Sequence, residues 1–224
     1  MQYRLRQNLS YCLIDGHPIF LDLDGDRYFQ LGGHLESAFL AYMGNGITDE
    51  TEVDKLIESK ILVRRPSSDH CPRTVAPPAR SSLELTKVSG RVRMTAILRV
   101  FKIVRNTSRQ LRTQPIKVVL DDLVRYRERR RVNAVASEPS NEQILELASA
   151  FGRSRLYVPF ETSTSCLLDS IALTKYLADH RISTHIVFGV TSNPFSAHCW
   201  VQHGDLVLND TVGNAASYTP IRVI

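Results

Sequence analysis

Three side chains in the last third of the chain have the types that nucleophilic catalysis needs, namely Cys166, His198 and Asp210. In such a set the thiolate attacks an acyl carbon, the histidine transfers the proton, and the carboxylate orients the imidazole. Cys166 follows the hydroxyl-rich residues 162–165 and precedes a helical apolar pattern, which predicts that it lies in the first turn of a helix. The unpaired N–H groups there favour a thiolate. Taken alone, such a cysteine is more often a small core residue.

His198 lies in an alternating stretch, residues 195–202, that predicts a strand. The alternation puts His198 and Trp200 on one face and Cys199 on the other, so that Cys199, the rival nucleophile, points away from the histidine. A histidine beside the chain's only tryptophan has two interpretations: an aromatic-packed surface residue, or a base whose access to water the indole restricts.

Asp210 ends the next predicted strand, residues 206–210, and the register of this hairpin decides the geometry. A three-residue loop pairs residue 202 with 206 and sets His198 directly opposite Asp210 on the same face. A two-residue loop pairs Cys199 with Asp210 instead, because a slip of one residue reverses the faces. The sequence leaves both registers open, and we expect the triad to require the first.

The bulk composition is that of a soluble globular protein, with 43% apolar and 23% charged residues in 224. Residues 1–20 contain no sustained apolar stretch, from which we expect no secretory signal, no association with a membrane and a cytoplasmic location. The four cysteines are scattered without a CxxC pair or zinc-finger spacing, which predicts reduced thiols, no metal site and no bound cofactor.

Basic residues dominate residues 91–131, where only Asp121, Asp122 and Glu128 oppose them. Such a stripe suits a nucleic acid or another acidic partner. Aromatic residues that could stack on bases are sparse within it, so a solvated helix face is the simpler interpretation.

The pattern of turns and apolar runs predicts an α+β protein of two domains. Residues 1–65 are predicted as short strands at 10–14, 19–23 and 27–31 followed by helices at 35–43 and 48–59, a winged-helix-like unit. The proline- and serine-rich residues 66–82 are predicted as a linker.

Residues 83–224 are predicted as helices followed by strands. We expect helices at 92–104, after Pro115, between Ser140 and Gly152, and at 165–179. Strands follow at 185–190, 197–202 and 206–210. This domain therefore holds all three candidate catalytic residues.

The catalytic motifs resemble those of lasso-peptide B proteins. The resemblance rests on Ser165-Cys166-Leu167-Leu168-Asp169-Ser170-Ile171-Ala172, on Phe195-x-Ala197-His198-x-Trp200-Val201, and on Gly204-x-x-Val207-Leu208-x-Asp210. It implies a papain- or transglutaminase-like cysteine peptidase that removes the leader from a ribosomally made precursor. Acyl transfer to an amine is the alternative outcome of the same chemistry, and a non-catalytic nucleic-acid binder is a third hypothesis. Family members often have alanine where Cys199 stands.

The first domain is similar to the PqqD-like leader-recognition domain that some B proteins carry ahead of the peptidase. The resemblance implies that the leader adds as an extended strand beside the third strand and against the last helix. It implies a groove formed by the following residues: Arg27, Tyr28, Phe29, Val53, Leu56 and Ile57. Taken singly, Tyr28, Phe29, Leu56 and Ile57 are better explained as core residues than as groove residues. The implied partners are the precursor's leader and an asparagine-synthetase-like cyclase, which would supply any use of ATP.

Overall fold

The computed structural model describes residues 3–45, 50–64, 74–85, 92–131, 139–158 and 165–224. The chain divides into two compact units, Met1–Pro72 and Arg73–Ile224, each with α and β structure. None of the helices in the described ranges is long and apolar enough to cross a membrane.

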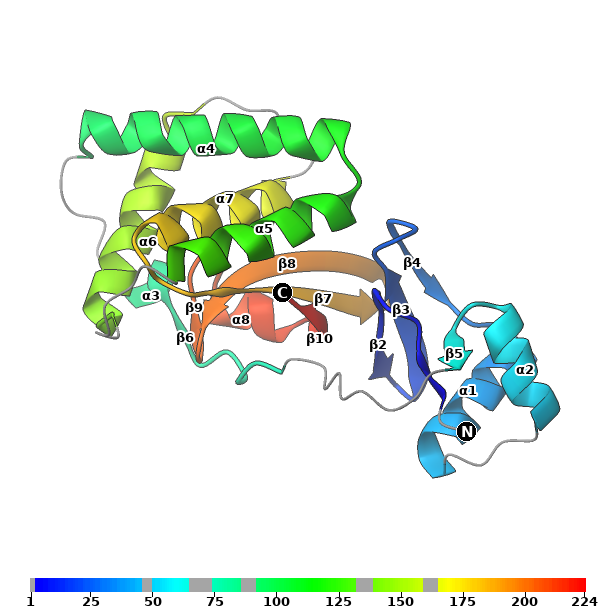
Figure 1. The fold of residues 1–224 in the computed structure, drawn as a ribbon. Coiled ribbons are helices and arrows are strands. Elements are labelled where there is room, and N and C mark those ends of the chain that lie inside the picture. The colour runs from blue at the N-terminus through cyan, green and yellow to red at the C-terminus, as the bar shows by residue number, and fades with distance from the viewer. Residues whose placement is uncertain (1–2, 46–49, 65–73, 86–91, 132–138, 159–164) are drawn as a thin grey trace. The chain divides into compact units, whose positions relative to one another are not determined.

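The first unit is built on a three-stranded antiparallel sheet (Figure 1). Its strands are β2 (Leu9–Ile14), β3 (His17–Asp22) and β4 (Arg27–Gln30), in that order. Asp15 and Gly16 form the β2–β3 turn with φ of 52° and 82°, the left-handed conformation that a two-residue hairpin requires. A second pair joins β1 (Tyr3–Leu5) to β5 (Leu62–Arg64), and the helices are α1 (Gly33–Asn45) and α2 (Glu50–Glu58).

Aromatic side chains form the core of the first unit. Phe20 of β3 and Phe39 of α1 are fully buried, with ring centroids 5.0 Å apart, and Phe29 of β4 stacks on Phe20 at 5.1 Å. Val53 and Leu56 of α2 are 5% and 0% exposed. Because these two side chains are buried, they form part of the core of the first unit. The more exposed of the six predicted residues remain as candidates for contact with a leader.

The second unit contains a five-stranded sheet in the order β10-β7-β8-β9-β6. The strands are β6 (Arg80–Ser81), β7 (His185–Ser192), β8 (Phe195–His203), β9 (Leu206–Val207) and β10 (Thr219–Val223). The helices are α3 (Ser82–Leu85), α4 (Met94–Thr113), α5 (Ile116–Arg131), α6 (Asn141–Arg155), α7 (Ser165–Asp179) and α8 (Val212–Ala216).

Helix α7 lies between α4 and the sheet (Figure 1), and contacts β8, α4 and α5. Its central residues Ile171, Ala172 and Leu177 are fully buried, because the helix is covered on several sides. The predicted capping box at the start of α6 is present, with Ser140 and Gln143 bonding each other's backbone N–H. The prediction that Gly152 ends this helix was wrong, since α6 continues to Arg155.

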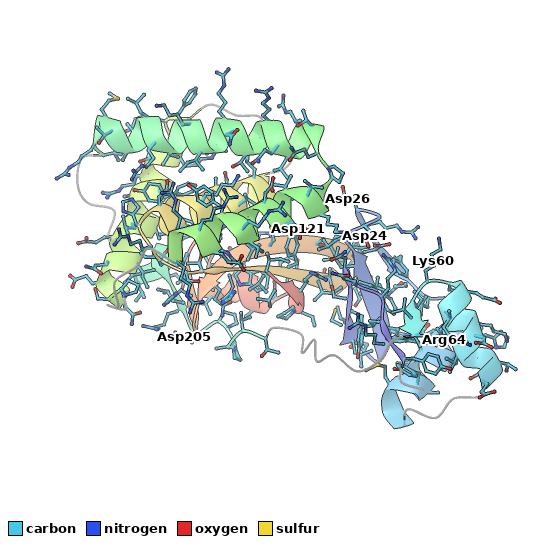
Figure 2. All side chains as sticks on the ribbon, in the orientation of Figure 1. Asp24, Asp26, Lys60, Arg64, Asp121 and Asp205 are labelled. Carbon is cyan, nitrogen blue, oxygen red and sulfur yellow. The ribbon has the colours of Figure 1, made fainter. Side chains whose placement is uncertain are left out.

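The second unit begins earlier than the predicted residue 83. Strand β6 pairs in parallel with β9, and the Arg80 guanidinium bonds both oxygens of Asp205, the residue labelled at the β8–β9 turn in Figure 2. The Gln202 amide donates to the Ala76 carbonyl oxygen at 2.6 Å. Residues 74–82, predicted as linker, are therefore tied to the second sheet, and residues 65–73 lie outside the described ranges.

Candidate active site

His198 and Asp210 are in direct contact. His198 Nε2 lies 2.6 Å from Asp210 Oδ2, and the two side chains are 20% and 14% exposed. A short contact between an imidazole and a partly buried carboxylate is the arrangement that fixes a ring's orientation and favours its charged form.

The hairpin of β8 and β9 has a two-residue loop, the register that we expected to keep His198 and Asp210 apart. Strand β8 pairs Gln202 with Val207 around the two-residue turn Gly204–Asp205, so a continued ladder would set Cys199 against Asp210. The ladder stops at Val207 instead, with one further backbone bond from Leu208 N to Val201 O. The expectation that the triad needs a three-residue loop was therefore wrong.

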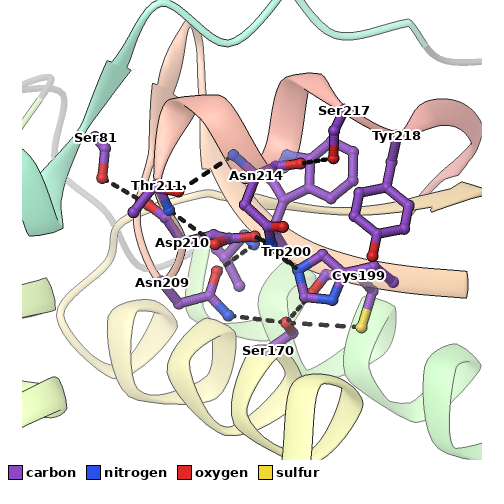
Figure 3. A network of polar contacts seen from close by, with 12 residues as sticks. Ser81, Ser170, Cys199, Trp200, Asn209, Asp210, Thr211, Asn214, Ser217 and Tyr218 are labelled. Atoms are coloured by element: carbon purple, nitrogen blue, oxygen red, sulfur yellow. Dashed lines mark hydrogen bonds and ion pairs between the residues drawn. The ribbon is translucent and has the colours of Figure 1, made fainter. Parts of the chain in front are cut away.

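Asn209 replaces the missing rung of the ladder. Its Oδ1 accepts from the Val201 backbone N–H at 2.7 Å, and its Nδ2 donates to the Ser170 hydroxyl of α7 at 3.0 Å (Figure 3). The chain leaves the sheet at this point, so that the direction of the Asp210 side chain no longer follows strand alternation.

Cys166 is the second residue of α7, in the first helical turn as predicted, and it is half-buried. A hydrogen bond with the Cys199 thiol, followed by one with His198, lowers the pKa of Cys166 to about 4, although burial opposes the shift. The backbone N–H of Cys199 also stabilises the thiolate. Cys166 is therefore a thiolate at neutral pH, which is the reactive form.

His198 carries the complementary shift. Its hydrogen bond with Cys166 raises the pKa of His198, as does its contact with Asp210, against the effect of burial. Since Nε2 faces Asp210, Nδ1 is the ring nitrogen left to bond the sulfur. The structure thus brings Cys166, His198 and Asp210 together, and their contacts favour the charged forms of the thiol and of the imidazole.

Thr211, the cap of α8, and Asn214 within α8 both donate hydrogen bonds to the Asp210 carboxylate. The sequence analysis did not find these two residues. Asn214 Nδ2 donates to Asp210 Oδ2 at 2.8 Å, and the Thr211 backbone N–H donates to Oδ1 at 2.8 Å. The Thr211 hydroxyl caps α8 by accepting from the Asn214 N–H. A threonine three residues before asparagine is a detectable capping signal, but the contact with Asp210 depends on the fold.

Aromatic side chains enclose the imidazole. The rings of Trp200 and Tyr218 lie 6.2 Å and 5.1 Å from that of His198. Gly189 of β7, which pairs with His198, makes room for both, because a Cβ there would lie 2.8 Å from each. The packing of Trp200 beside His198 fits both interpretations of this pair, and Tyr218, which the sequence analysis missed, packs against the imidazole as well.

Cys199 lies on the face of β8 opposite His198, as predicted, but that face covers α7. Its sulfur is 3.8 Å from the Ser170 hydroxyl, and the Ser170 Oγ donates to the Cys199 carbonyl at 3.3 Å. The thiol of Cys199 therefore points to the face opposite His198, as expected, and it contacts α7 there.

The residues predicted for leader binding all lie in the first unit. Arg27 is exposed, its guanidinium lies 5.3 Å above the Phe29 ring, and Tyr28 and Ile57 are partly buried. A pocket of about 330 Å³ lies beside β4, and it is lined by Arg6, Asp22, Asp24, Gly25, Arg27, Phe29, Leu31, Ser59, Lys60 and Ile61. Of the six predicted residues, Arg27 and Phe29 line this pocket.

Comparisons with known proteins give one relative and one family. Over 47 residues the chain is 43% identical to the microcin J25-processing protein McjB of Escherichia coli, a match that covers 21% of this chain and 23% of that protein. The chain thus matches less than a quarter of that relative's length. No solved structure matches the chain.

The sequence pattern of the transglutaminase-like superfamily matches residues 110–223, a range that includes Cys166, His198 and Asp210. Because that match covers just over half of the chain, this protein belongs to the transglutaminase-like superfamily.

Proposed function

We propose that this protein is a cysteine peptidase that removes the leader from a ribosomally made precursor of the lasso-peptide class. The observation that carries the proposal is the contact of the Cys166 thiolate with His198, whose Nε2 lies 2.6 Å from Asp210. The likeness to McjB, which by its name processes microcin J25, supports the substrate class.

In the proposed reaction the Cys166 sulfur attacks the carbonyl carbon of the scissile peptide bond. His198, as imidazolium, gives its proton to the leaving amine, and a thioester remains. Neutral His198 then takes a proton from water, whose oxygen attacks the thioester and releases the leader's carboxylate. Asp210 holds the ring and stabilises its charged form. The backbone N–H of Cys166 at the start of α7 is the proposed oxyanion donor.

We place leader binding on the first unit. Strand β4 is at the edge of the three-stranded sheet, so an extended peptide can add to it by main-chain hydrogen bonds. The pocket beside β4 offers apolar surface from Phe29, Leu31 and Ile61, and charge from groups that include Lys60 and Asp24, both labelled in Figure 2. In this proposal the released core peptide passes to an asparagine-synthetase-like cyclase.

The nucleophile is tested by incubating the purified protein with a precursor peptide and following the core peptide by mass spectrometry. Cys166→Ala is expected to abolish release, because it removes the attacking sulfur. Cys12→Ala is the matched control, since Cys12 is a buried thiol of β2 in the first unit. Release of core peptide by Cys166→Ala would remove the assignment.

The leader site is tested separately by measuring binding of the isolated leader peptide by calorimetry. Arg27→Glu reverses an exposed charge beside β4 and is expected to weaken binding, whereas Arg129→Glu makes the same change on α5 and is expected to leave it unchanged. Equal effects of both substitutions would place the leader elsewhere.

Acyl transfer to an amine is a second candidate, and membership of the transglutaminase-like superfamily favours it. It differs only in the nucleophile that resolves the thioester. Incubation with precursor and an added primary amine separates the two outcomes, because transfer leaves an amide adduct and hydrolysis leaves a carboxylate.

A nucleic-acid-binding role for the basic stripe receives little support. Three arginines of α5 make contacts within the chain: Arg125 bonds Asp122, Arg130 bonds Asp179, and Arg127 donates to the Ile224 carbonyl. A titration with duplex DNA at low salt is expected to show no binding.

A further inference from the structure

The second thiol at the active site stabilises the Cys166 thiolate but forms no covalent bond in the proposed mechanism. Cys199 is 3% exposed, and its sulfur contacts the Ser170 hydroxyl at 3.8 Å. Ser170 lies four residues after Cys166 on α7, so the two occupy the same face of the helix one turn apart. A side chain that contacts Ser170 from β8 is thus within reach of Cys166, and the Cys199 thiol does hydrogen-bond the Cys166 sulfur.

The two sulfurs differ in reactivity. The hydrogen bonds that lower the pKa of Cys166 make it a half-buried thiolate, whereas contact with that thiolate, followed by burial, raises the pKa of Cys199 well above its usual value. Cys166 is therefore the thiol that reacts with an oxidant, and Cys199 is held protonated beside it. This asymmetry is typical of a redox-sensitive cysteine with its resolving partner.

We propose that Cys166 and Cys199 form a reversible disulfide when a hydroperoxide reaches the site, and that this disulfide switches the enzyme off. The Cys166 thiolate attacks one peroxide oxygen, the O–O bond breaks, and a sulfenic acid forms. The departing hydroxide takes a proton from the His198 imidazolium and leaves as the first water. The Cys199 sulfur then attacks the Cys166 sulfur, the S–O bond breaks, and the departing hydroxide takes the Cys199 proton as a second water. Two thiols are oxidised by two electrons, and one hydrogen peroxide is reduced to two waters.

The disulfide would block the proposed chemistry and also protect it. It occupies the sulfur that attacks the substrate, so turnover stops until a thiol reductant restores it. It also competes with further oxidation of Cys166 to the sulfinic acid, which simple thiols do not reverse. The loss of activity rests on the proposed role of Cys166, but formation of the disulfide does not.

The test treats the full-length protein with hydrogen peroxide at neutral pH and maps its peptides without reduction. We expect a linked pair of peptides containing Cys166 and Cys199. Cys12 should remain an unoxidised thiol, because it is buried. Peptidase activity of the wild type is expected to fall on oxidation and to return with dithiothreitol.

The matched variant is Cys199→Ala, with its activity compared only with that of its own untreated sample. In this variant Cys166 is expected to pass to the sulfinic acid, and its activity is expected to stay lost after dithiothreitol. Cys12→Ala serves as the control and should behave as the wild type does. Sulfinic Cys166 in the oxidised wild type without the linked peptides, or equal recovery of both proteins, would overturn the proposal. The peptide map gives its answer even if no peptidase activity is found, so that failure of the proposed function is distinguishable.

Discussion

Asn214 donates a hydrogen bond of 2.8 Å to Oδ2 of Asp210, the same oxygen that His198 Nε2 approaches at 2.6 Å. The other carboxylate oxygen accepts from the Thr211 N–H. Both oxygens of Asp210 are therefore held from α8 and its cap, and the carboxylate cannot turn away from the imidazole without losing these bonds. In the proposed mechanism Asn214 is therefore a positioning residue that acts through Asp210.

Removal of this amide is expected to affect turnover more than binding. In Asn214→Ala we expect kcat to fall about 10- to 100-fold with KM nearly unchanged, the equivalent of one hydrogen bond to a charged group. Asn214→Asp places a second negative charge near His198, whose Nε2 is 3.5 Å from the amide. It is expected to move the alkaline limit of activity to higher pH, because the extra charge stabilises the imidazolium.

A fold defect alone would lower the activity of both Asn214 variants without moving the pH limit of Asn214→Asp. The same limit in the wild type and in Asn214→Asp would therefore contradict a positioning role. Circular dichroism of each variant establishes that the comparison is made between folded proteins.

The ion pair predicts a broad active range of pH. Activity should rise as pH passes through about 4, where Cys166 loses its proton, and fall only above the ordinary imidazole value of 6.5, since His198 loses its proton at a raised pKa. The rate of alkylation of Cys166 by iodoacetamide measures the acid limb without any substrate. Alkylation that rises only above pH 8, as for a free thiol, would show that no ion pair forms.

The close approach of two aromatic rings to Gly189 makes a steric prediction. Gly189→Ala puts a Cβ 2.8 Å from both Trp200 and Tyr218. Because this overpacks the core, the free energy of unfolding of the second unit is expected to fall by roughly 1–3 kcal/mol. Both rings enclose His198, so activity should fall as well. Urea unfolding followed by Trp200, the chain's only tryptophan, reports on the second unit.

Gly152→Ala is the matched control for that experiment. A Cβ at Gly152 meets nothing within 4 Å, and the residue lies within α6, where alanine is favoured over glycine by roughly 0.5–1 kcal/mol. The two substitutions should therefore change stability in opposite directions, and a shared direction would refute the steric argument.

Much of the secondary structure was predictable because it is locally encoded. The turn Asp15–Gly16 fixes the first hairpin, and the capping box fixes the start of α6. The elements that the sequence analysis missed depend on distant partners. Strand β6 has only two residues and forms by pairing with β9. Strand β10 contains Pro220, which argues against a strand in general but is tolerated here, since β10 is at the sheet's edge and irregular at that point.

The three candidate catalytic residues could be picked out from the sequence because of their types, their order and the helical pattern after Cys166. The way in which His198 meets Asp210 could not, because alternation describes a strand only while its ladder lasts. Here the ladder ends at Val207, and the side chain of Asn209 takes over its last bond. Asn214 and Tyr218 reach the site from α8 and the residue before β10, so that only the fold brings them there.

Asn209 is accordingly expected to contribute to both stability and activity. Asn209→Ala leaves the Val201 N–H without its acceptor and removes the bond to Ser170 of α7. We therefore expect the free energy of unfolding of the second unit to fall by about 1–3 kcal/mol. Activity should fall too, because Asp210 follows directly on this anchor. Thr113→Ala, which removes an exposed side-chain bond near the end of α4, is the control and should be nearly neutral. Urea unfolding monitored at Trp200 gives the comparison, and equal midpoints for the wild type and Asn209→Ala would mean that the hairpin holds Asp210 in place without this side chain.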